Sequence, residues 1–387
     1  MGWKETSVTE ERMKFVTAWL EGGWSMAELC RAFGVSRKTG YKVLQRYCEE
    51  GLEGLRDRSR APHCQANATP PELVRELIRI RKKYGWGGRK TIDYLAMRRP
   101  RGELPAPSTV DEIFRRHGLV KPRRRRRKRL EVKTVKQVRA PNDRWCADFK
   151  GWFRTRDGSR CDPLTITDSY SRFLVRCQHV DSLRFEHAKP QFERAFRDYG
   201  LPKAIRTDNG SPFATVGIAG LSRLSVWFIR LGIYPDLIEP GKPQQNGRHE
   251  RMHRTLKGQT ARPPKHSLRA QQRAFYDFRR MYNQERPHDG IGGRTPASIY
   301  DGSTRAFPRK LPELDYPTSF EIRRVMKNGA IALQGTVLFL GAALRGQHVG
   351  LEPVSDLQLA VHFGPYEIAT INRRTNEVLA YRKARLP

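Results

Sequence analysis

The chain has 387 residues, and its 74 Lys and Arg residues against 40 Asp and Glu residues give a formal net charge of +34. A positive field of this size attracts polyanions and speeds their capture, so nucleic acid is the expected partner. An anionic membrane is the rival partner, but no segment reads as a long amphipathic basic helix beside a hydrophobic anchor. The length allows three or four domains of ordinary size.

The six cysteines are scattered, and no two of them form a C-x-x-C pair. This spacing argues against a zinc ribbon and against a disulfide framework, so we expect a reducing cytoplasm. The N-terminal residues lack the apolar stretch of a signal peptide. No apolar run is long enough to span a membrane, so no membrane partner is expected.

Residues 1–52 are predicted to form a helix-turn-helix DNA-binding domain. Its first helix has an apolar face made of Met13, Phe15, Val16 and Leu20. The second helix opens at Ser25 with Glu28 three positions later, which is a capping-box pattern. The third helix begins at Ser36, and a recognition helix presents its N-terminal residues to base edges. The expected DNA contacts are therefore Arg37, Lys38, Thr39 and Tyr41. The alternative is a plain three-helix bundle with a basic surface.

A second helix-turn-helix-like domain is predicted over residues 71–120, after a linker at residues 53–70 that lacks periodicity. Its last helix is expected to start with Ser108 as the N-cap, so Ser108 and Thr109 are further candidate DNA contacts. Residues 121–138 are a basic linker, which cannot pack because like charges repel and are costly to bury. We expect it to lie along phosphates through Arg123, Arg124, Arg125, Arg126 and Arg127. A solvated flexible tether is the alternative.

From residue 142 the pattern changes to alternating, strand-like segments. The expected order is three antiparallel strands, a helix, a strand, a helix, a strand and a helix. This is the order of an RNase H-like α/β domain with a mixed five-stranded sheet, which we assign to residues 139–300. Residues 301–316 read as a linker. Residues 317–387 are predicted to form a small β-barrel from short strands, with a hairpin signal at Asn328-Gly329. The predicted fold is therefore multidomain: all-α helix-turn-helix units, an α/β core and a C-terminal barrel.

Four motifs lie in and after the predicted core: W-x-x-D at residues 145–148, T-D-N-G at 207–210, K-P-Q-Q-N-G-x-x-E-R at 242–251, and Y-N-x-x-R-P-H at 282–288 followed by T-P at 295–296. As a set they resemble the motifs of bacterial insertion-sequence DDE transposases of the retroviral-integrase superfamily. The similarity covers most of the chain.

The resemblance implies that Asp148, Asp208 and Glu250 are the catalytic residues and the metal ligands. In-line exchange of a phosphodiester requires both the attacking and the leaving oxygen to be stabilised, which two metal ions do. Mg²⁺ takes hard oxygen ligands and keeps several waters, so a few convergent carboxylates suffice. We therefore expect two Mg²⁺ ions, with Mn²⁺ as a possible substitute.

Each acid also has a simpler interpretation: Asp148 as an exposed strand residue, Asp208 as a turn cap, and Glu250 as a solvated helix carboxylate. Asp168 is a competing first acid because it too ends a strand. One departure from the family is the 41 residues between Asp208 and Glu250, about two helical turns more than the commonest spacing. The extra length is expected in residues 214–228, as a loop and a longer helix.

The predicted helix that carries Glu250 also carries Arg254 and Lys257, four and seven positions later and therefore on the same face. With Asn246 in the polar loop before the helix, they are candidate DNA contacts. A salt bridge from Glu250 to Arg254 is the alternative. His249 and His253 have a metal-ligand spacing, but the sequence offers no evident third ligand, so they are interpreted as DNA-facing or structural.

The functional hypothesis is a transposase that binds the terminal inverted repeats of its element, cleaves at the 3′ ends and joins them to target DNA. Double-stranded DNA is the expected partner, and work on two ends predicts a homodimer or higher homo-oligomer. The expected location is the bacterial cytoplasm, at the nucleoid. The alternatives are a catalytically inactive DNA-binding regulator derived from a transposase, and an RNase H-like nuclease or junction resolvase.

Overall fold

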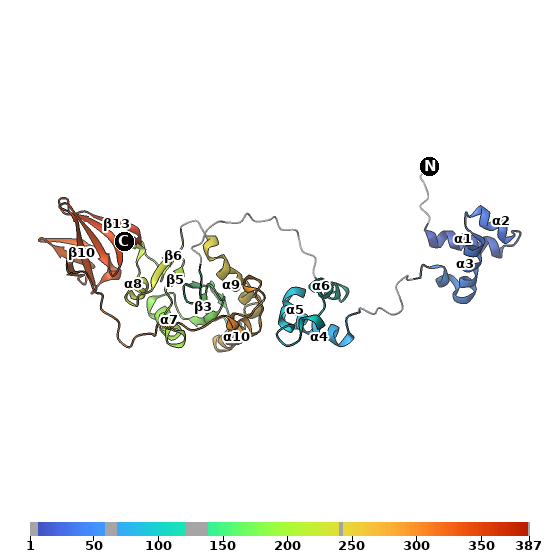
Figure 1. The fold of residues 1–387 in the computed structure, drawn as a ribbon, viewed down its shortest axis with the longest axis horizontal. Helices are drawn as coiled ribbons and strands as arrows, with labels where there is room; N and C mark the ends of the chain where they lie inside the picture. The colour runs from blue at the N-terminus through green and yellow to red at the C-terminus, as the bar shows by residue number, and fades with distance from the viewer. Residues whose placement is uncertain (1–6, 59–67, 121–137, 240–242, 386–387) are drawn as a thin grey trace. The chain divides into compact units, whose positions relative to one another are not determined.

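A computed structural model describes residues 7–58, 68–120, 138–239 and 243–385. The chain divides into two compact units, residues 1–70 and residues 71–387, and Figure 1 shows the elements of each. The predicted DNA contacts of the basic linker, residues 123–127, lie outside the described residues. Within the described parts of the chain, no helix is long and apolar enough to cross a membrane.

The first unit contains the predicted helix-turn-helix elements: α1 (Val8–Leu20), α2 (Met26–Ala32), α3 (Arg37–Glu50) and the 3₁₀ turn η1 (Gly51–Leu55). The predicted capping box is confirmed, because the Ser25 side chain accepts from the Glu28 amide and Glu28 accepts from the Ser25 amide. α3 packs tightly on α2 at Gly40, where an added Cβ would lie 2.6 Å from the Cys30 sulfur. Of the predicted apolar face of α1, Phe15 and Val16 are buried, whereas the other two members, Met13 and Leu20, are exposed.

The second helical module consists of α4 (Pro71–Tyr84), α5 (Gly88–Leu95), the 3₁₀ turn η2 (Arg101–Glu103) and α6 (Pro107–Arg116). Its core is built from the apolar faces of all three helices, including Leu77, Leu95 and Phe114. The expected N-cap at Ser108 is wrong, because α6 begins one residue earlier, at Pro107, with Ala106 in the cap position. Proline fits the first helical position since it has no N–H to leave unpaired and its φ is already helical.

The central domain is an α/β sandwich around one mixed sheet. Its strands are β1 (Trp145–Phe149), β2 (Phe153–Arg154), β3 (Arg160–Asp168), β4 (Leu174–Val180), β5 (Ala204–Thr207) and β6 (Tyr234–Leu237). The order is β2-β3-β1-β5-β6, with β4 also paired to β3. The β1–β5 and β5–β6 pairs are parallel and the others antiparallel. The predicted mixed sheet is confirmed, with the two-residue β2 as a sixth strand.

The helices of this domain are α7 (Phe185–Tyr199), α8 (Arg223–Arg230), α9 (Gly247–Thr260) and α10 (Leu268–Arg280), with shorter turns η3 (Ile218–Gly220), η4 (Pro243–Asn246), η6 (Asp289–Ile291) and η7 (Pro296–Ser298) and the π-helical turn η5 (Met281–Glu285). One apolar core joins the sheet to α7 and α8 through Trp145, Ala147 and Phe196. A second core joins the opposite face to α9 and α10 through Met252 and Phe275. Side chains alternate across a strand, so Cys146 and Asp148 of β1 point to the α9 face.

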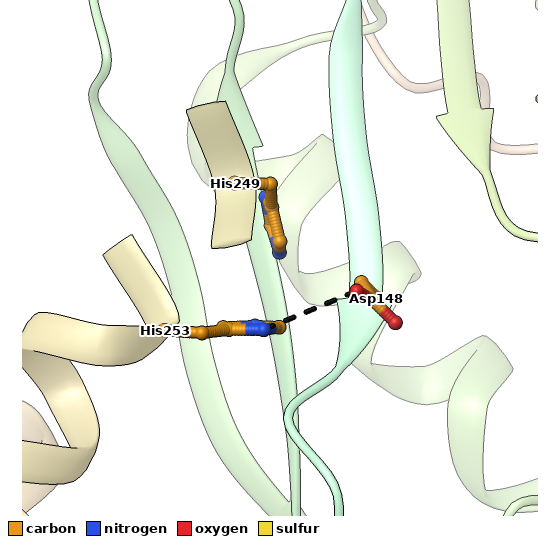
Figure 2. A group of neighbouring side chains, drawn as sticks. All are labelled: Asp148, His249 and His253. Carbon is orange, nitrogen blue, oxygen red and sulfur yellow. Dashed lines mark ion pairs between the residues drawn. The ribbon is translucent and has the colours of Figure 1, made fainter. Parts of the chain in front are cut away.

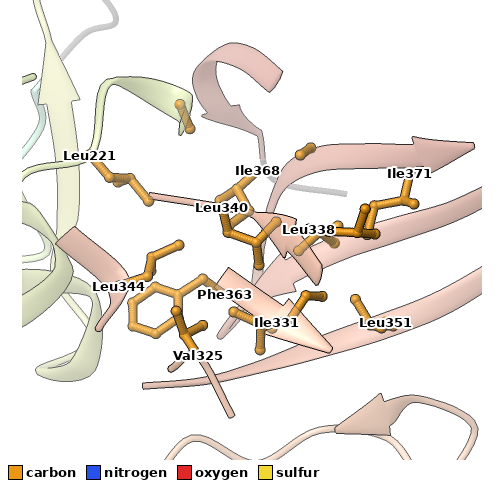
Figure 3. Packing of buried hydrophobic residues seen from close by; sticks show 14 of the residues in the cluster. Leu221, Val325, Ile331, Leu338, Leu340, Leu344, Leu351, Phe363, Ile368 and Ile371 are labelled. Atoms are coloured by element: carbon orange, nitrogen blue, oxygen red, sulfur yellow. The ribbon is translucent and has the colours of Figure 1, made fainter. Parts of the chain in front are cut away.

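The extra length between Asp208 and Glu250 is a loop and not a longer helix. α8 has eight residues, and the residues before it form a loop closed by a bridge between Ala214 and Leu221. Leu221 is buried in the core of the C-terminal domain together with Val226 of α8, and Figure 3 shows Leu221 beside Leu340 and Ile368. The loop therefore joins the central domain to the C-terminal domain.

The C-terminal domain contains β7 (Glu321–Arg324), β8 (Ala330–Leu333), β9 (Thr336–Phe339), β10 (His348–Ser355), β11 (Gln358–Phe363), β12 (Tyr366–Asn372), β13 (Val378–Arg385) and the 3₁₀ turn η8 (Ala342–Leu344). Five strands pair in the order β13-β12-β11-β10-β7, and β8 pairs only with β9 among the described residues. The predicted β-barrel is not confirmed, because the pairings between described strands leave both sheets open. A turn does lie at Asn328-Gly329, where the Gly329 amide donates to the Met326 carbonyl oxygen. The predicted hairpin is wrong among the described strands, because β7 pairs with β10 and β8 with β9.

Candidate active site

Asp148 and Asp208 lie at the ends of neighbouring parallel strands. The register pairs Trp145 with Ile205 and Cys146 with Arg206. Two further steps along both strands bring Asp148 of β1 beside Asp208, the first residue after β5. The carboxyl ends of parallel strands meet at one edge of a sheet, so the two carboxylates share that edge.

The electrostatics of Asp148 indicate that the three predicted acids lie close together. The pKa of Asp148 is raised to about 7, mainly by burial and then by the charges of Asp208 and Glu250, against an opposing backbone hydrogen bond. Burial also raises the pKa of Asp208, while the Gly210 amide partly offsets that effect. Like charges crowded in a partly dry site favour a proton or a cation there.

Glu250 lies on α9, a helix with one buried face and one exposed face. The buried face includes His249, Met252, His253 and Leu256. Glu250 lies on the exposed face, and Arg254 and Lys257 are exposed there too, as their spacing predicts. This face therefore combines one candidate metal ligand with two cations.

The two histidines of α9 are held against β3 by threonine hydroxyls. The ring of His249 lies 2.7 Å from Thr165 Oγ1 through Nε2 and 2.7 Å from Thr167 Oγ1 through Nδ1. His253 Nε2 lies 2.6 Å from Thr165 Oγ1. Burial lowers the pKa of His249 to about 3 and is also the largest cause of the lowered pKa of His253. Both rings are therefore neutral and buried, so the interpretation of them as DNA-facing is wrong.

The hydrogen-bond pattern assigns a tautomer to His253. Thr165 donates its single hydroxyl proton to the Asp148 carbonyl oxygen, at 3.1 Å. Both histidines must then donate N–H to the Thr165 oxygen. His253 Nδ1 is therefore unprotonated, and it faces Asp148 Oδ2 at 3.9 Å, as Figure 2 shows.

A lone pair that faces a carboxylate suits a cation between them. One potential ligand atom from each of Asp148, His249 and His253 lies within 4.8 Å of the others. Since both nitrogens of His249 are already bonded to threonines, His253 is the histidine with a free coordinating atom. The acidic residue that the sequence did not connect with the two histidines is thus Asp148. The sequence T-I-T at residues 165–167 was the available signal for this network. Side chains alternate across a strand, so Thr165 and Thr167 share one face and Ile166 lies on the other.

Asn246 lies within the site and not on an outer DNA-gripping surface. Its side chain is 5% exposed, and Nδ2 lies 3.4 Å from Asp148 Oδ2. Its Oδ1 has no hydrogen-bond partner among the described residues. The geometry therefore supports a role of Asn246 in orienting Asp148.

Asp168, the competing first acid, is a turn anchor. It is 1% exposed and its side chain accepts from the amides of Asn142, Tyr170 and Ser171. In the register it lies opposite Trp145, whereas Asp148 lies opposite Thr165. Asp168 is therefore three pairs away from the carboxylate edge, with its oxygens already occupied.

The remaining predicted DNA contacts lie on the helical modules. The side chains at the start of α3 are all exposed: Arg37, Lys38, Thr39 and Tyr41. Ser108 and Thr109 are exposed in the first turn of α6. The starts of α3 and α6 are therefore exposed to solvent, as the predicted DNA contacts require.

Comparison with known families finds an integrase core domain at residues 138–243, matched again by a second integrase core model at residues 231–296. A helix-turn-helix domain matches residues 11–63, and a homeodomain-like domain matches residues 39–114. The central α/β domain and the N-terminal helical region thus match the predicted types.

Relatives occur on bacterial insertion elements. The chain is 27% identical over 227 residues to the 31.7 kDa protein of insertion element IS407 of Burkholderia multivorans, a match that covers 58% of this chain and 78% of the relative. It is 29% identical to the 39.2 kDa protein of IS476 of Xanthomonas euvesicatoria, over 58% of this chain and 62% of the relative. A simian T-cell lymphotropic virus intasome structure aligns with 80% of this chain and 98% of its own chain, at 13% identity and a TM-score of 0.38.

Proposed function

Because the chain belongs to the insertion-sequence transposases of the retroviral-integrase superfamily, we propose that it cleaves the 3′ ends of its element and joins them to target DNA. The observation that supports the proposal is that the strand register brings Asp148 and Asp208 to one sheet edge, while α9, which packs its His253 near Asp148, carries Glu250. The charges of Asp208 and Glu250 disfavour ionised Asp148, and a bound cation would offset that effect.

The residues fit a pair of divalent metal ions. The donors are hard carboxylate oxygens, which Mg²⁺ prefers and Mn²⁺ also accepts. Asp148, Asp208 and Glu250 would hold the two ions. When bound, the ions would activate a nucleophilic oxygen and stabilise the leaving oxygen of the phosphodiester.

The surrounding residues position these ligands and the DNA. Thr165 holds Asp148 through its backbone oxygen, and the Asn246 side chain donates to its carboxylate. Arg254 and Lys257 extend the exposed face beside Glu250, where their charges would bind the DNA backbone. The exposed starts of α3 and α6 would read the terminal repeats. Joining two ends calls for a homodimer or a higher oligomer.

A cleavage and joining assay tests the proposal. The full chain is incubated with Mg²⁺ and a duplex that carries the terminal repeat found beside its gene. We expect strand cleavage and joining, and their loss in Asp148→Asn at unchanged DNA affinity. Asp277→Asn is the matched control, because Asp277 lies on exposed α10 surface. Equal activity of Asp148→Asn and the wild type would overturn the assignment.

The second candidate function is a DNA-binding regulator without catalysis. It is favoured by the first unit, which has its own buried core around Phe15 and Leu29 and an exposed recognition helix. Specific repeat binding with no metal-dependent cleavage of any end would support the regulator over the transposase.

A further inference from the structure

A cavity of about 380 Å³ lies beside the carboxylate edge and is not used by the metal chemistry. Five arginines line it: Arg144, Arg172, Arg206, Arg248 and Arg294. They come from β5, α9 and the segments around β1, β3 and η6, which are separated in sequence. The fold thus gathers five guanidinium groups around one hollow.

Acidic residues neutralise this cluster only in part. Asp236 pairs with both Arg144 and Arg206, at 3.0 Å and 2.7 Å. Asp168 is the acidic residue among the described lining residues, and backbone amides already occupy its oxygens. Five guanidinium groups against two carboxylates leave a net charge of +3.

The other three arginines meet carbonyl oxygens. Arg172 and Arg248 converge on the same acceptor, the carbonyl oxygen of Ser169, at 2.7 Å and 3.4 Å. Arg294 donates to the carbonyl oxygen of Ile291. The pKa of Arg172 is lowered to about 10, mainly by burial and then by the charge of Arg248. Two repelling cations that line one cavity favour an anion between them.

The cavity adjoins the active site through two side chains. Cys146 lines it two residues before Asp148 on the same face of β1. Asn246 lines it as well, while Nδ2 of the same side chain reaches Asp148 Oδ2. Asn246 Oδ1 is buried without a partner among the described residues. A ligand in the cavity would therefore lie next to the scissile phosphate without being it.

We propose that the cavity binds a phosphodiester group of the DNA strand, adjacent to the one that reacts. This inference rests on the proposed function. Guanidinium pairs bind phosphate oxygens in a fixed fork geometry, and a backbone phosphate held here would fix the strand's register over the carboxylates. The Arg-rich linker is a poor occupant, because its charge has the same sign as that of the cavity.

Neutral phosphate analogues test the assignment one position at a time. A terminal-repeat duplex is made with a single methylphosphonate at each linkage around the cleavage point. Equilibrium binding is measured with Ca²⁺ in place of Mg²⁺, so the readout does not require cleavage. For the wild type, one or two linkages next to the scissile one should each weaken binding about tenfold when neutralised.

The variants are Arg172→Met and Arg248→Met, with Arg273→Met on the exposed surface of α10 as the control. Each cavity variant should bind unmodified DNA about tenfold more weakly and lose its sensitivity to those same linkages. Arg248 is exposed, so Arg248→Met keeps the test valid if Arg172→Met fails to fold. The control should keep the wild-type profile.

Two results would overturn the proposal. One is a wild-type methylphosphonate profile in both cavity variants. The other is stabilisation of the protein by inorganic pyrophosphate that depends on Arg172, with no sensitive linkage in DNA, which would identify a free anion as the ligand. A failure of the transposase function differs from both, because unmodified DNA would then bind but never be cut with Mg²⁺.

Discussion

At the residue scale, the site depends on a single hydroxyl group. Thr165 bonds the backbone of Asp148 and the rings of His249 and His253, so it fixes the strand, the helix and a tautomer together. The motifs predicted the acids and their order along the chain. They could not predict this network, because Thr165 and His253 are 88 residues apart and meet only when α9 packs on β3.

Thr165→Val should therefore affect catalysis more than stability. Valine keeps the shape but leaves the buried ring nitrogens without a partner, which costs about 1–3 kcal/mol. We expect a fall of that size in the free energy of unfolding, measured with urea, and a loss of kcat greater than the loss of DNA affinity. Thr255→Val on α9, the helix that carries both histidines, is the control, because the Thr255 hydroxyl donates to the Arg251 carbonyl oxygen of its own helix. Unchanged kcat in Thr165→Val would refute the positioning role.

Carboxylate repulsion predicts a pH effect in metal-free protein. The pKa of Asp148 is raised to about 7 in the folded chain, so its contribution to stability is complete below about pH 4 and lost as the pH rises through 7. Asp208→Asn removes one repelling charge and should raise the melting temperature in EDTA at pH 8 but not at pH 4. A lower melting temperature than the wild type at pH 8 would contradict this account.

At the element scale, the sequence predicted the strands and helices of the central domain in the correct order. Periodicity and turn signals are local, and each of these elements is long or strongly patterned. The segment before and through α8 was expected to hold both a loop and a longer helix. The loop is present, but α8 has only eight residues. Ala219 and Leu221 instead complete the core of the C-terminal domain, a tertiary role that leaves no local signal. The N-cap of α6 was misplaced because Pro107 outweighs Ser108 at the first turn.

Leu221→Ala tests the packing of the loop before α8 against the C-terminal domain. Removing a buried leucine side chain costs about 2–5 kcal/mol, and the lost contacts lie between the loop and the C-terminal domain. Amide hydrogen exchange should therefore speed up in β13 and in the residues before α8 together. Val216 is fully exposed in the same loop, so Val216→Ala should change neither. Faster exchange confined to the loop would mean that the two domains are not coupled there.

At the scale of the whole molecule, the positive charge and the separate compact units have different expected roles. The net charge of +34 makes binding to DNA strongly salt-dependent, whatever its sequence. Composition predicted that partner class directly. Whether the C-terminal strands close into a barrel or form open sheets could not be predicted, because strand pairing between distant segments leaves no local signal.

Removal of residues 1–70, a compact unit with its own core, should separate recognition from chemistry. The remaining chain should lose preference for the terminal repeat over random DNA, and the slope of log K against log salt should become shallower. It should still cut DNA non-specifically with Mg²⁺. Retention of full repeat preference would show that α4–α6 and the central domain read the sequence alone.

The proposed function requires that carboxylates from β1, the end of β5 and α9 form one divalent metal site. Calorimetric titration of the full chain with Mn²⁺ tests it most directly, with Asp148→Asn, Asp208→Asn, Glu250→Gln and the control Asp277→Asn measured in parallel. We expect each of the first three variants to weaken metal binding at least about tenfold, which is ~1.4 kcal/mol, and the control to bind like the wild type. Wild-type Mn²⁺ affinity in any one of these three variants would show that its residue is not a metal ligand, and would contradict a site made of all three carboxylates.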